Sequence, residues 1–230
     1  ADLLLASNVF AHADDLKSMA ESMKKLIKPD GKIIIEVQYL LNTIRDLTFD
    51  NIYHEHTNYW SLSALNIFFE KLDLKIFKVE KINTHGGSIR VFVSQDKDIL
   101  VNQSVNITLQ EEEEFGLKNI STYLEFGKKI ENLKKEVIKN IKGLKKKYSS
   151  IIGYGAPAKA TTALNFFNIS KEIDYIIEDN KLKHGKYIPG VNIKIVSKEE
   201  IKNEDQAILV LAWNFFDEIK KNNKDLKNNF

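Results

Sequence analysis

The chain has no cysteine, only three prolines and no long apolar run. The absence of cysteine excludes disulfides and thiolate metal ligands within these 230 residues. No apolar stretch approaches the roughly 20 residues that a membrane helix needs. The opening run, residues 1–6, is too short for a secretory signal and lacks the basic flank of one. We therefore expect a cytoplasmic protein that contacts no membrane.

The sequence also has little charge imbalance. Its 34 basic residues nearly balance its 32 acidic ones, and the net charge of +2 argues against a general nucleic-acid-binding protein. The basic residues are nearly all lysine, and they concentrate in residues 128–147 and 220–227, where a solvated helix face is the plain interpretation. Hydrophobic residues make up 43% of the chain, which is enough for a sizeable core.

The beginning of the chain has the pattern of a βαβ unit. Its three elements are a buried strand over residues 1–6, an amphipathic helix over 13–26 and a second buried strand over 32–37. In open parallel sheets, ligands bind beyond the carboxyl ends of the strands. We therefore expect Asn8 and His12, which follow the first strand, to border one crevice with residues 38–60, which follow the second.

The middle of the chain predicts a hairpin and then a long helical stretch. After a helix over residues 62–72, residues 74–82 and 88–94 predict an antiparallel hairpin at the sheet edge, because a short glycine-bearing link joins them. Residues 107–148 predict one long helix or two consecutive ones. Within this stretch, Glu111–Glu114 is expected near the helix start, where carboxylates suit the dipole, and three glycines suggest breaks: Gly116, Gly127 and Gly143.

The last third of the chain predicts a second α/β unit. Its expected elements are a strand from residue 150, a helix ending near 167, strands over 173–177, 191–196 and 207–212, and helices over 197–202 and 214–220.

The segment 51–60 follows no apolar period and concentrates reactive side chains. Tyr53, His54, Glu55 and His56 can accept and donate protons from acid to alkaline pH, and histidine changes its charge nearest neutrality. Our hypothesis is that this run is the acid/base centre of an enzyme. Two other interpretations stay open. One is a surface loop with coincidental histidines, and the other is a metal site whose third ligand is not evident.

Two further polar groups have two interpretations each. Asn8 and His12 are either a polar pair at the start of a helix or contacts for substrate and cofactor. His85, Gly86 and Gly87 are either turn residues of the hairpin or a bare backbone that a ligand can approach closely.

The run Gly153-Tyr-Gly-Ala-Pro-Ala158 follows a strand and opens a helix, so its N–H groups and the helix dipole can hold a phosphate. Ala158 stands where a dinucleotide fingerprint has its third glycine, and Glu178-Asp179 falls near the expected acidic position. The alternative is a tight strand–helix turn that binds no ligand.

Taken together, these motifs resemble those of the nucleotide-sugar C-methyltransferases in order and spacing. The matching runs are Asn8–His12, Tyr53–His56, His85–Phe92, Gly153–Lys159 and Glu178–Asn180 with Pro189-Gly190. The resemblance covers essentially the whole chain. It implies an α/β fold: the C-terminal half of a class I S-adenosylmethionine-dependent methyltransferase sheet, of Rossmann-like type with parallel strands plus an antiparallel hairpin, followed by a second, smaller Rossmann-like domain. The implied boundaries are 1–100 for the partial methyltransferase domain, 101–148 for a helical connector and 149–230 for a nucleotide-sugar-binding domain.

The resemblance also implies an activity. Such enzymes use S-adenosylmethionine to methylate a carbon next to a ketone of a dTDP-linked deoxysugar. By this resemblance His56 is the base that removes the α-proton. Tyr53, Glu55 and His12 bind the sugar or stabilise the enolate, and Asn8 contacts the cofactor.

The substrate-binding residues that the resemblance implies are His85, Gly86, Gly87, Arg90, Gly153, Gly155, Ala156, Pro157, Lys159, Glu178 and Asn180. None of the residues is assigned to a metal. Family members carry zinc in a cysteine-ligated domain upstream, followed by the strand and glycine-rich loop that hold S-adenosylmethionine. We expect the chain to be a monomeric fragment that binds S-adenosylmethionine poorly by itself. Two other functions stay open: an NAD-dependent oxidoreductase that uses residues 153–158, and a non-catalytic nucleotide-sugar-binding module.

Overall fold

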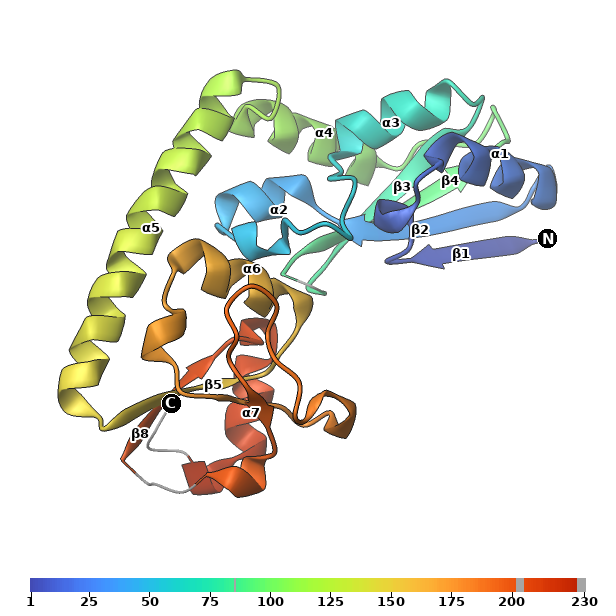
Figure 1. The fold of residues 1–230 in the computed structure, drawn as a ribbon. Helices are drawn as coiled ribbons and strands as arrows, with labels where there is room; N and C mark the ends of the chain where they lie inside the picture. The colour runs from blue at the N-terminus through green and yellow to red at the C-terminus, as the bar shows by residue number, and fades with distance from the viewer. Residues whose placement is uncertain (85, 202–204, 227–230) are drawn as a thin grey trace. The chain divides into compact units, whose positions relative to one another are not determined.

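The computed structural model describes residues 1–84, 86–201 and 205–226, and Figure 1 shows its fold. Packing divides the chain into two compact units. Unit 1 contains Ala1–Phe49 and His54–Gly127, and unit 2 contains Asp50–Tyr53 and Lys128–Phe230. Each unit is described by itself below.

Unit 1 is built on a four-stranded sheet with the strand order β1-β2-β4-β3. Its strands are β1 (Leu3–Ser7), β2 (Lys32–Gln38), β3 (Lys75–Ile82) and β4 (Ser88–Ser94). β1 pairs with β2 in parallel, and β4 pairs with both β2 and β3 in antiparallel fashion. The predicted parallel strands and antiparallel hairpin are therefore confirmed, and β3 lies at the sheet edge.

The helices of unit 1 cover one face of this sheet. They are α1 (Leu16–Leu26), α2 (Leu40–Arg45), α3 (Leu62–Glu70) and α4 (Gln103–Phe115). A short 3-10 turn, η1 (Phe10–His12), precedes α1, and another, η2 (Phe49–Asn51), lies between α2 and α3. Figure 1 shows α1 and α3 on the same side of the strands. Because strand side chains alternate between faces, Ile35 and Val91 are fully buried under the helices. Glu36 and Arg90, which pair across β2 and β4, lie on the other face.

The helical stretch predicted over residues 107–148 is two helices, α4 and α5 (Ile120–Lys147). The break falls at Gly116, whose φ of +80° lies in the left-handed region that glycine adopts without strain. Gly127 and Gly143 lie inside α5, so the breaks suggested there were wrong.

The Glu111–Glu114 run lies at the end of α4 and not near a helix start, so the dipole interpretation of these carboxylates was also wrong. The helix starts earlier than predicted because the Asn102 side chain caps it, accepting a hydrogen bond from the Ser104 N–H at 2.9 Å. A side-chain cap also sets the start of α1, which begins at Leu16 behind Asp15, later than the predicted residue 13.

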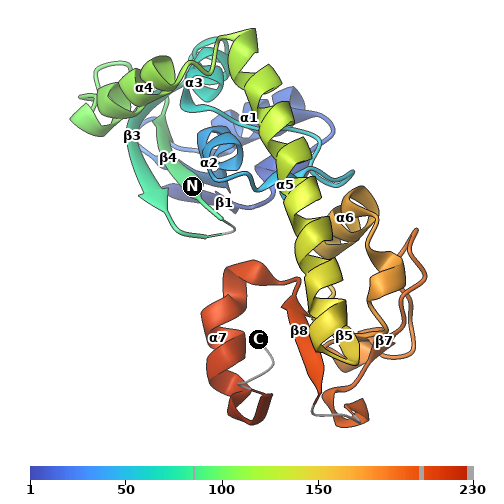
Figure 2. The same ribbon diagram turned by 90° about the vertical axis from the view of Figure 1, so that its left-hand side faces the viewer.

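Unit 2 is built on a second sheet, with the strand order β7-β6-β5-β8 and parallel pairing throughout. Its strands are β5 (Ser150–Tyr154), β6 (Ile176–Ile177), β7 (Ile195–Val196) and β8 (Gln206–Val210). Its helices are α6 (Ala158–Phe167), α7 (Phe216–Asn222) and the part of α5 from Lys128 onwards. Figure 2 shows α5 and α7 on opposite sides of β5 and β8. The predicted Rossmann-like second unit is confirmed.

Several elements of unit 2 are shorter than predicted. The strands expected over residues 173–177 and 191–196 keep only two residues each. Much of unit 2 is short 3-10 turns: η3 (Ser170–Glu172), η4 (Lys181–Lys183), η5 (Lys198–Glu200), η6 (Trp213–Phe215) and η7 (Lys224–Leu226). In the described part of the helix expected over 197–202, the chain forms one such turn, η5. Across the described residues, none of the helices has the length and apolar character to cross a membrane.

Candidate active site

Unit 1 brings together two histidines that are distant in sequence. His12 ends η1, just beyond the carboxyl end of β1, and His56 lies in the loop between η2 and α3. Their ring centroids are 4.9 Å apart, with the ring planes at 53°. His12 is exposed and His56 is half-buried, so a ligand can reach the pair from solvent. This arrangement suits proton transfer to and from a bound molecule.

The loop that carries His56 is bonded to η1 by its own backbone. The His12 Nδ1 atom lies 2.7 Å from the Glu55 carbonyl oxygen. A carbonyl oxygen can only accept, so Nδ1 carries the hydrogen, and Nε2 is the lone-pair atom of the neutral ring. The Thr57 N–H and hydroxyl both donate to the Ala11 carbonyl oxygen, at 3.2 and 3.1 Å. No sequence motif indicated the part played by Thr57.

An aromatic cluster joins the two segments that carry the histidines. Phe10, two residues before His12, is 0% exposed. Its ring centroid lies 5.7 Å from that of Trp60 and 5.8 Å from those of Phe68 and Phe69. The contacts are tilted, edge-on and stacked, in that order, and such aromatic contacts are favourable beyond their buried area. The cluster therefore ties η1 to the end of the loop and to α3.

The other members of the reactive run lie around this pair in different ways. His54 and Glu55 are exposed, and Tyr59 is half-buried with its ring centroid 6.5 Å from that of His56. Tyr53 is half-buried. It is the last residue of the short segment Asp50–Tyr53 that belongs to unit 2. In the described part of the chain, no three His, Cys, Asp or Glu side chains gather as a metal site, so the third ligand of the metal interpretation is not supplied there.

Asn8 occupies the carboxyl end of β1 in a left-handed backbone conformation, with φ of 55°. Asparagine tolerates this region better than most residues. Its N–H donates to the Glu36 carbonyl oxygen at 3.0 Å, and its side-chain amide makes a long contact of 3.4 Å with the Ser7 hydroxyl. The side chain is half-buried.

The hairpin glycines have a packing role. Gly87 has a φ of +109°, and a Cβ there would lie 2.5 Å from the Asn42 side chain. Its carbonyl accepts from the Tyr39 N–H at 3.1 Å, and Gly86 also has a positive φ, of 85°. These features fit the turn interpretation. His85 lies outside the described residues, so its predicted contact with substrate stays a prediction.

Arg90 is held in an ion-pair network on the sheet. Its Nη2 atom lies 2.9 Å from Glu36 Oε2, and its Nη1 atom lies 3.6 Å from Glu80 Oε2. The Thr84 hydroxyl donates to Glu36 Oε1 at 3.2 Å, and Glu36 is only 7% exposed. These ion-pair partners of Arg90 are not the two histidines, and its assignment to substrate binding stays a prediction.

Replacing Arg90 with methionine is expected to lower the free energy of unfolding by about 2 kcal/mol, because it leaves the buried Glu36 carboxylate without its charged partner. Urea denaturation measures this loss. The matched control is Arg45→Met, which removes an exposed pair with Asp46 and should cost under about 0.5 kcal/mol. Equal losses in the two variants would contradict the role given to the Glu36 pair.

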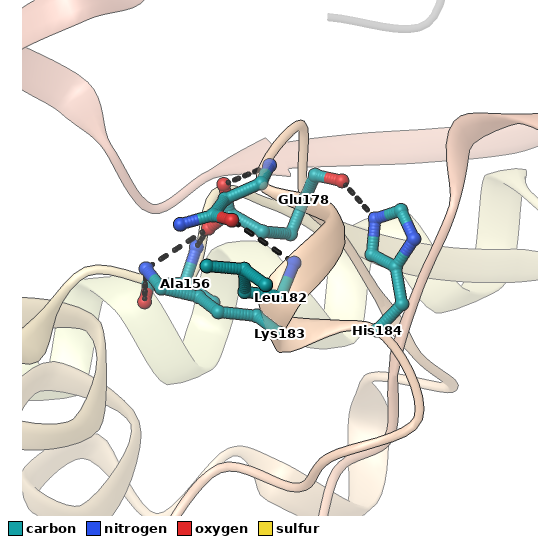
Figure 3. A network of polar contacts seen from close by, with 6 residues as sticks. Ala156, Glu178, Leu182, Lys183 and His184 are labelled. Atoms are coloured by element: carbon teal, nitrogen blue, oxygen red, sulfur yellow. Dashed lines mark hydrogen bonds and ion pairs between the residues drawn. The ribbon is translucent and has the colours of Figure 1, made fainter.

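In unit 2, the turn between β5 and α6 binds acceptors of the chain itself (Figure 3). The Gly155 N–H donates to the Ile177 carbonyl oxygen at 2.7 Å, and the Ala156 N–H donates to Glu178 Oε2 at 2.8 Å. The other oxygen of Glu178 accepts from the Asn180 N–H at 3.0 Å. A phosphate at this turn would therefore have to displace the Glu178 carboxylate.

The side chains of Lys183 and His184 also lie close to Glu178. Lys183 Nζ lies 3.4 Å from Glu178 Oε2 and donates to the Ala156 carbonyl oxygen at 2.9 Å, while His184 Nε2 lies 2.6 Å from the Glu178 carbonyl oxygen. Burial alone raises the pKa of Glu178, but the Asn180 and Ala156 N–H groups together with Lys183 outweigh it, and the net pKa is lowered. Glu178 is thus an internal anion at neutral pH.

A pocket of about 390 Å³ adjoins this turn at the carboxyl ends of β5 and β8. Its walls are formed by Tyr154, Gly155, Pro157, Glu178, Asp179, Lys183, Ala212, Phe215, Glu218, Ile219, Asn222 and Asn223. The Tyr154 hydroxyl donates to Asp179 Oδ1 at 2.9 Å. Burial, followed by Asp179, raises the pKa of Tyr154 to about 12. The pocket lies where parallel α/β sheets bind ligands.

Lys159, the first-turn lysine of α6, is buried against Trp213. Its Nζ atom lies 4.4 Å from the centre of the Trp213 ring and 3.4 Å from Asn214 Oδ1. The Trp213 Nε1–H group donates to Asp50 Oδ2 at 2.6 Å. Burial lowers the pKa of Lys159 and raises that of Asp50, which is 6% exposed. Asp50 and Trp213 were not predicted, since 163 residues separate them and neither lies in a local motif.

The Asp50–Trp213 contact predicts a pH-dependent fluorescence signal. Because burial raises the pKa of Asp50, the fold favours its protonated form, and the stability that this preference contributes is lost as pH rises through that pKa. Trp213 emission should change with a midpoint above the ordinary aspartate value of about 4. Asp50→Asn should abolish the change. A midpoint at the ordinary value, or one that persists in Asp50→Asn, would contradict this assignment.

Comparison with known proteins gives two findings. Residues 83–229 match the family model described as the C-methyltransferase C-terminal domain. Over 232 aligned residues the chain is 33% identical to the C-methyltransferase NovU of Streptomyces niveus, and the alignment covers 100% of this chain and 55% of that protein. The chain therefore spans about half the length of this curated relative.

Proposed function

Because the chain belongs to the C-methyltransferase family, we propose that it takes part in methyl transfer from S-adenosylmethionine to a carbon next to the ketone of a dTDP-linked deoxysugar. One observation carries the chemical part of this proposal: the imidazoles of His12 and His56, 4.9 Å apart, in a loop region open to solvent. A carbon acid needs both a base and a group that stabilises the enolate oxygen, and a pair of adjacent histidines can supply both.

In the proposed reaction, His56 acts as the base. Its neutral ring accepts the α-proton, and the C–H electron pair becomes the double bond of the enolate while negative charge develops on the ketone oxygen. His12 is proposed to stabilise that oxygen as an imidazolium: the Glu55 carbonyl holds its Nδ1–H, and a second proton on Nε2 is donated to the substrate oxygen. Tyr53 and the Glu55 side chain are proposed to orient the sugar.

Asn8 is the residue of this chain that we propose to contact the cofactor. When bound, S-adenosylmethionine supplies a sulfonium-linked methyl group, which the carbon nucleophile takes as a neutral thioether leaves. Asn8 fits such a polar ligand, because it follows the carboxyl end of a parallel strand and, within the described residues, its side-chain amide makes a long contact of 3.4 Å with the Ser7 hydroxyl.

Unit 2 is proposed to bind the nucleotide part of the substrate. Its parallel sheet and its pocket at the strand carboxyl ends support this role. The proposed contacts remain Gly153, Gly155, Ala156, Pro157, Lys159, Glu178 and Asn180. Because Glu178 already binds the Ala156 N–H, the phosphates must either displace this carboxylate or lie beside the turn.

The same contact weighs against the oxidoreductase alternative. Dinucleotide-binding folds hold the pyrophosphate with N–H groups of the turn between strand and helix. Here the Gly155 and Ala156 N–H groups bond to Ile177 and Glu178. The non-catalytic binding module remains the second candidate, favoured by the pocket of unit 2, and it predicts nucleotide binding without turnover.

The test of the proposal is transfer of a labelled methyl group. The longest natural protein that contains this chain is incubated with [methyl-¹³C]S-adenosylmethionine and a dTDP-linked keto-deoxysugar, and the product is examined by NMR. We expect one new ¹³C methyl resonance bonded to a sugar carbon. A label on oxygen, or no label on a nucleotide sugar that is bound to the protein, would sink the proposal.

A further inference from the structure

Glu112 is a buried carboxylate of α4 that holds the beginning of another helix. It is 3% exposed. Its Oε1 atom accepts from the Leu62 N–H at 2.5 Å, and its Oε2 atom accepts from the Ser63 N–H at 2.9 Å. These N–H groups belong to the first turn of α3, where a helix has no backbone acceptors of its own. A negative charge there is also favoured by the helix dipole.

The first turn of α3 ends the loop that carries His56. Leu62 follows His56 by only six residues, and the residues between them are bonded at several points. The Trp60 carbonyl accepts from the Leu40 N–H at 2.9 Å, and the Ser61 hydroxyl caps the helix through the Ala64 N–H at 3.1 Å. Any shift of the first turn of α3 is therefore passed along a short, tightly bonded segment towards His56.

A carboxylate that uses both oxygens fixes a helix end better than a single capping bond. One bond leaves rotation about its axis, whereas two bonds to successive N–H groups set both the height and the direction of the turn. The charge of Glu112 also acts at Tyr39, whose pKa is raised above its usual range mainly by burial and then by this carboxylate. Tyr39 pairs with Trp60 through an isolated parallel bridge.

We propose that Glu112 is a positioning residue for the histidine pair: by fixing the first turn of α3, it sets the loop that places His56 beside His12. Its kinetic consequence rests on the proposed function, since the residue touches no reacting atom. A purely structural Glu112 would change stability and leave the histidine geometry of the folded protein unaltered. The two roles therefore differ in what they do to His56.

Glu112→Gln separates these roles, because its amide keeps the volume but provides only one acceptor oxygen for the two N–H groups. We expect the ring ¹H–¹³C resonances of His12 and His56 to move in the folded variant, while that of His184 in unit 2 stays in place. In the longest natural protein, kcat for α-proton exchange of the dTDP-linked keto-deoxysugar should fall at least about tenfold, with KM within about threefold. If the Gln variant does not fold, Glu112→Asp keeps the charge, shortens the reach and should show the same changes.

The matched control is Asn102→Ala. Asn102 caps the same helix α4 at its other end, through the Ser104 N–H, so its loss destabilises α4 without removing a bond to α3. It should leave the resonances of His12 and His56 unmoved and kcat within about twofold. The inference is overturned if folded Glu112→Gln leaves both histidine resonances in place, or if Asn102→Ala moves them equally. If even the wild-type protein exchanges no α-proton, the proposed function fails, and the resonances still decide the role of Glu112.

Discussion

Replacing His56 with asparagine is expected to slow exchange of the substrate α-proton by about 1,000-fold, within the range that a positioned general base contributes. Asparagine has a similar shape but no basic lone pair at neutral pH, so the proton has no acceptor. Affinity for dTDP should change by less than about threefold, because the proposed nucleotide contacts are in unit 2. The measurement is deuterium incorporation into the dTDP-linked keto-deoxysugar in D₂O, followed by NMR.

The matched control for this prediction is His54→Asn. His54 is an exposed histidine two residues away in the same loop, so it reports on any general effect of losing an imidazole there. Its exchange rate should stay within about threefold of that of the wild-type protein. Equal losses in both variants, or an unchanged rate in His56→Asn, would remove His56 from the role of base.

Replacing Phe10 with alanine is expected to lower the free energy of unfolding by about 3–5 kcal/mol. The ring is fully buried and contacts Trp60, Phe68 and Phe69, so its removal leaves a cavity that three other rings line. Because these contacts support both η1 and the end of the loop, the His12 and His56 ring resonances should also broaden or move. Urea denaturation, followed by circular dichroism and Trp fluorescence, gives the stability.

The neighbouring Val9 provides the control for the aromatic cluster. It is 49% exposed, and Val9→Ala should cost under about 0.5 kcal/mol. A loss below about 1 kcal/mol in Phe10→Ala would mean that the cluster repacks around the missing ring. In that case, the aromatic cluster would not be a rigid support for η1 and the end of the loop.

Local sequence patterns predicted most of the helices and strands, because the spacing of apolar residues reflects which side of each element is buried. The β-branched runs in β2 and β4 and the apolar spacing of α1 and α3 each reflect one buried face. The errors came where the local signal was weak. Gly127 and Gly143 do not break α5, because a glycine costs only about 1 kcal/mol in a helix and α5 has 28 residues to absorb it. The six-residue α2 is too short to show a period.

One topological rule allowed the proximity of His12 to the segment that contains His56 to be predicted from the sequence. Residues that follow neighbouring parallel strands lie at the same sheet edge, and this placed His12 near the segment that contains His56. The supporting contacts lay beyond such reasoning. Glu112 reaches α3 across 50 residues, and the ion pair of Arg90 with Glu36 depends on the register of β2 and β4. Those contacts exist only once the elements have packed, so no local motif reveals them.

Deuterium exchange by the wild-type protein without S-adenosylmethionine tests whether this protein enolises its substrate. The claim is that the His12–His56 pair removes a proton from the carbon next to the ketone before any methyl group moves. We expect deuterium to be incorporated at that carbon faster than in buffer alone, and not at the other sugar carbons. A bound keto-deoxysugar that keeps every α-proton over the same time would contradict it.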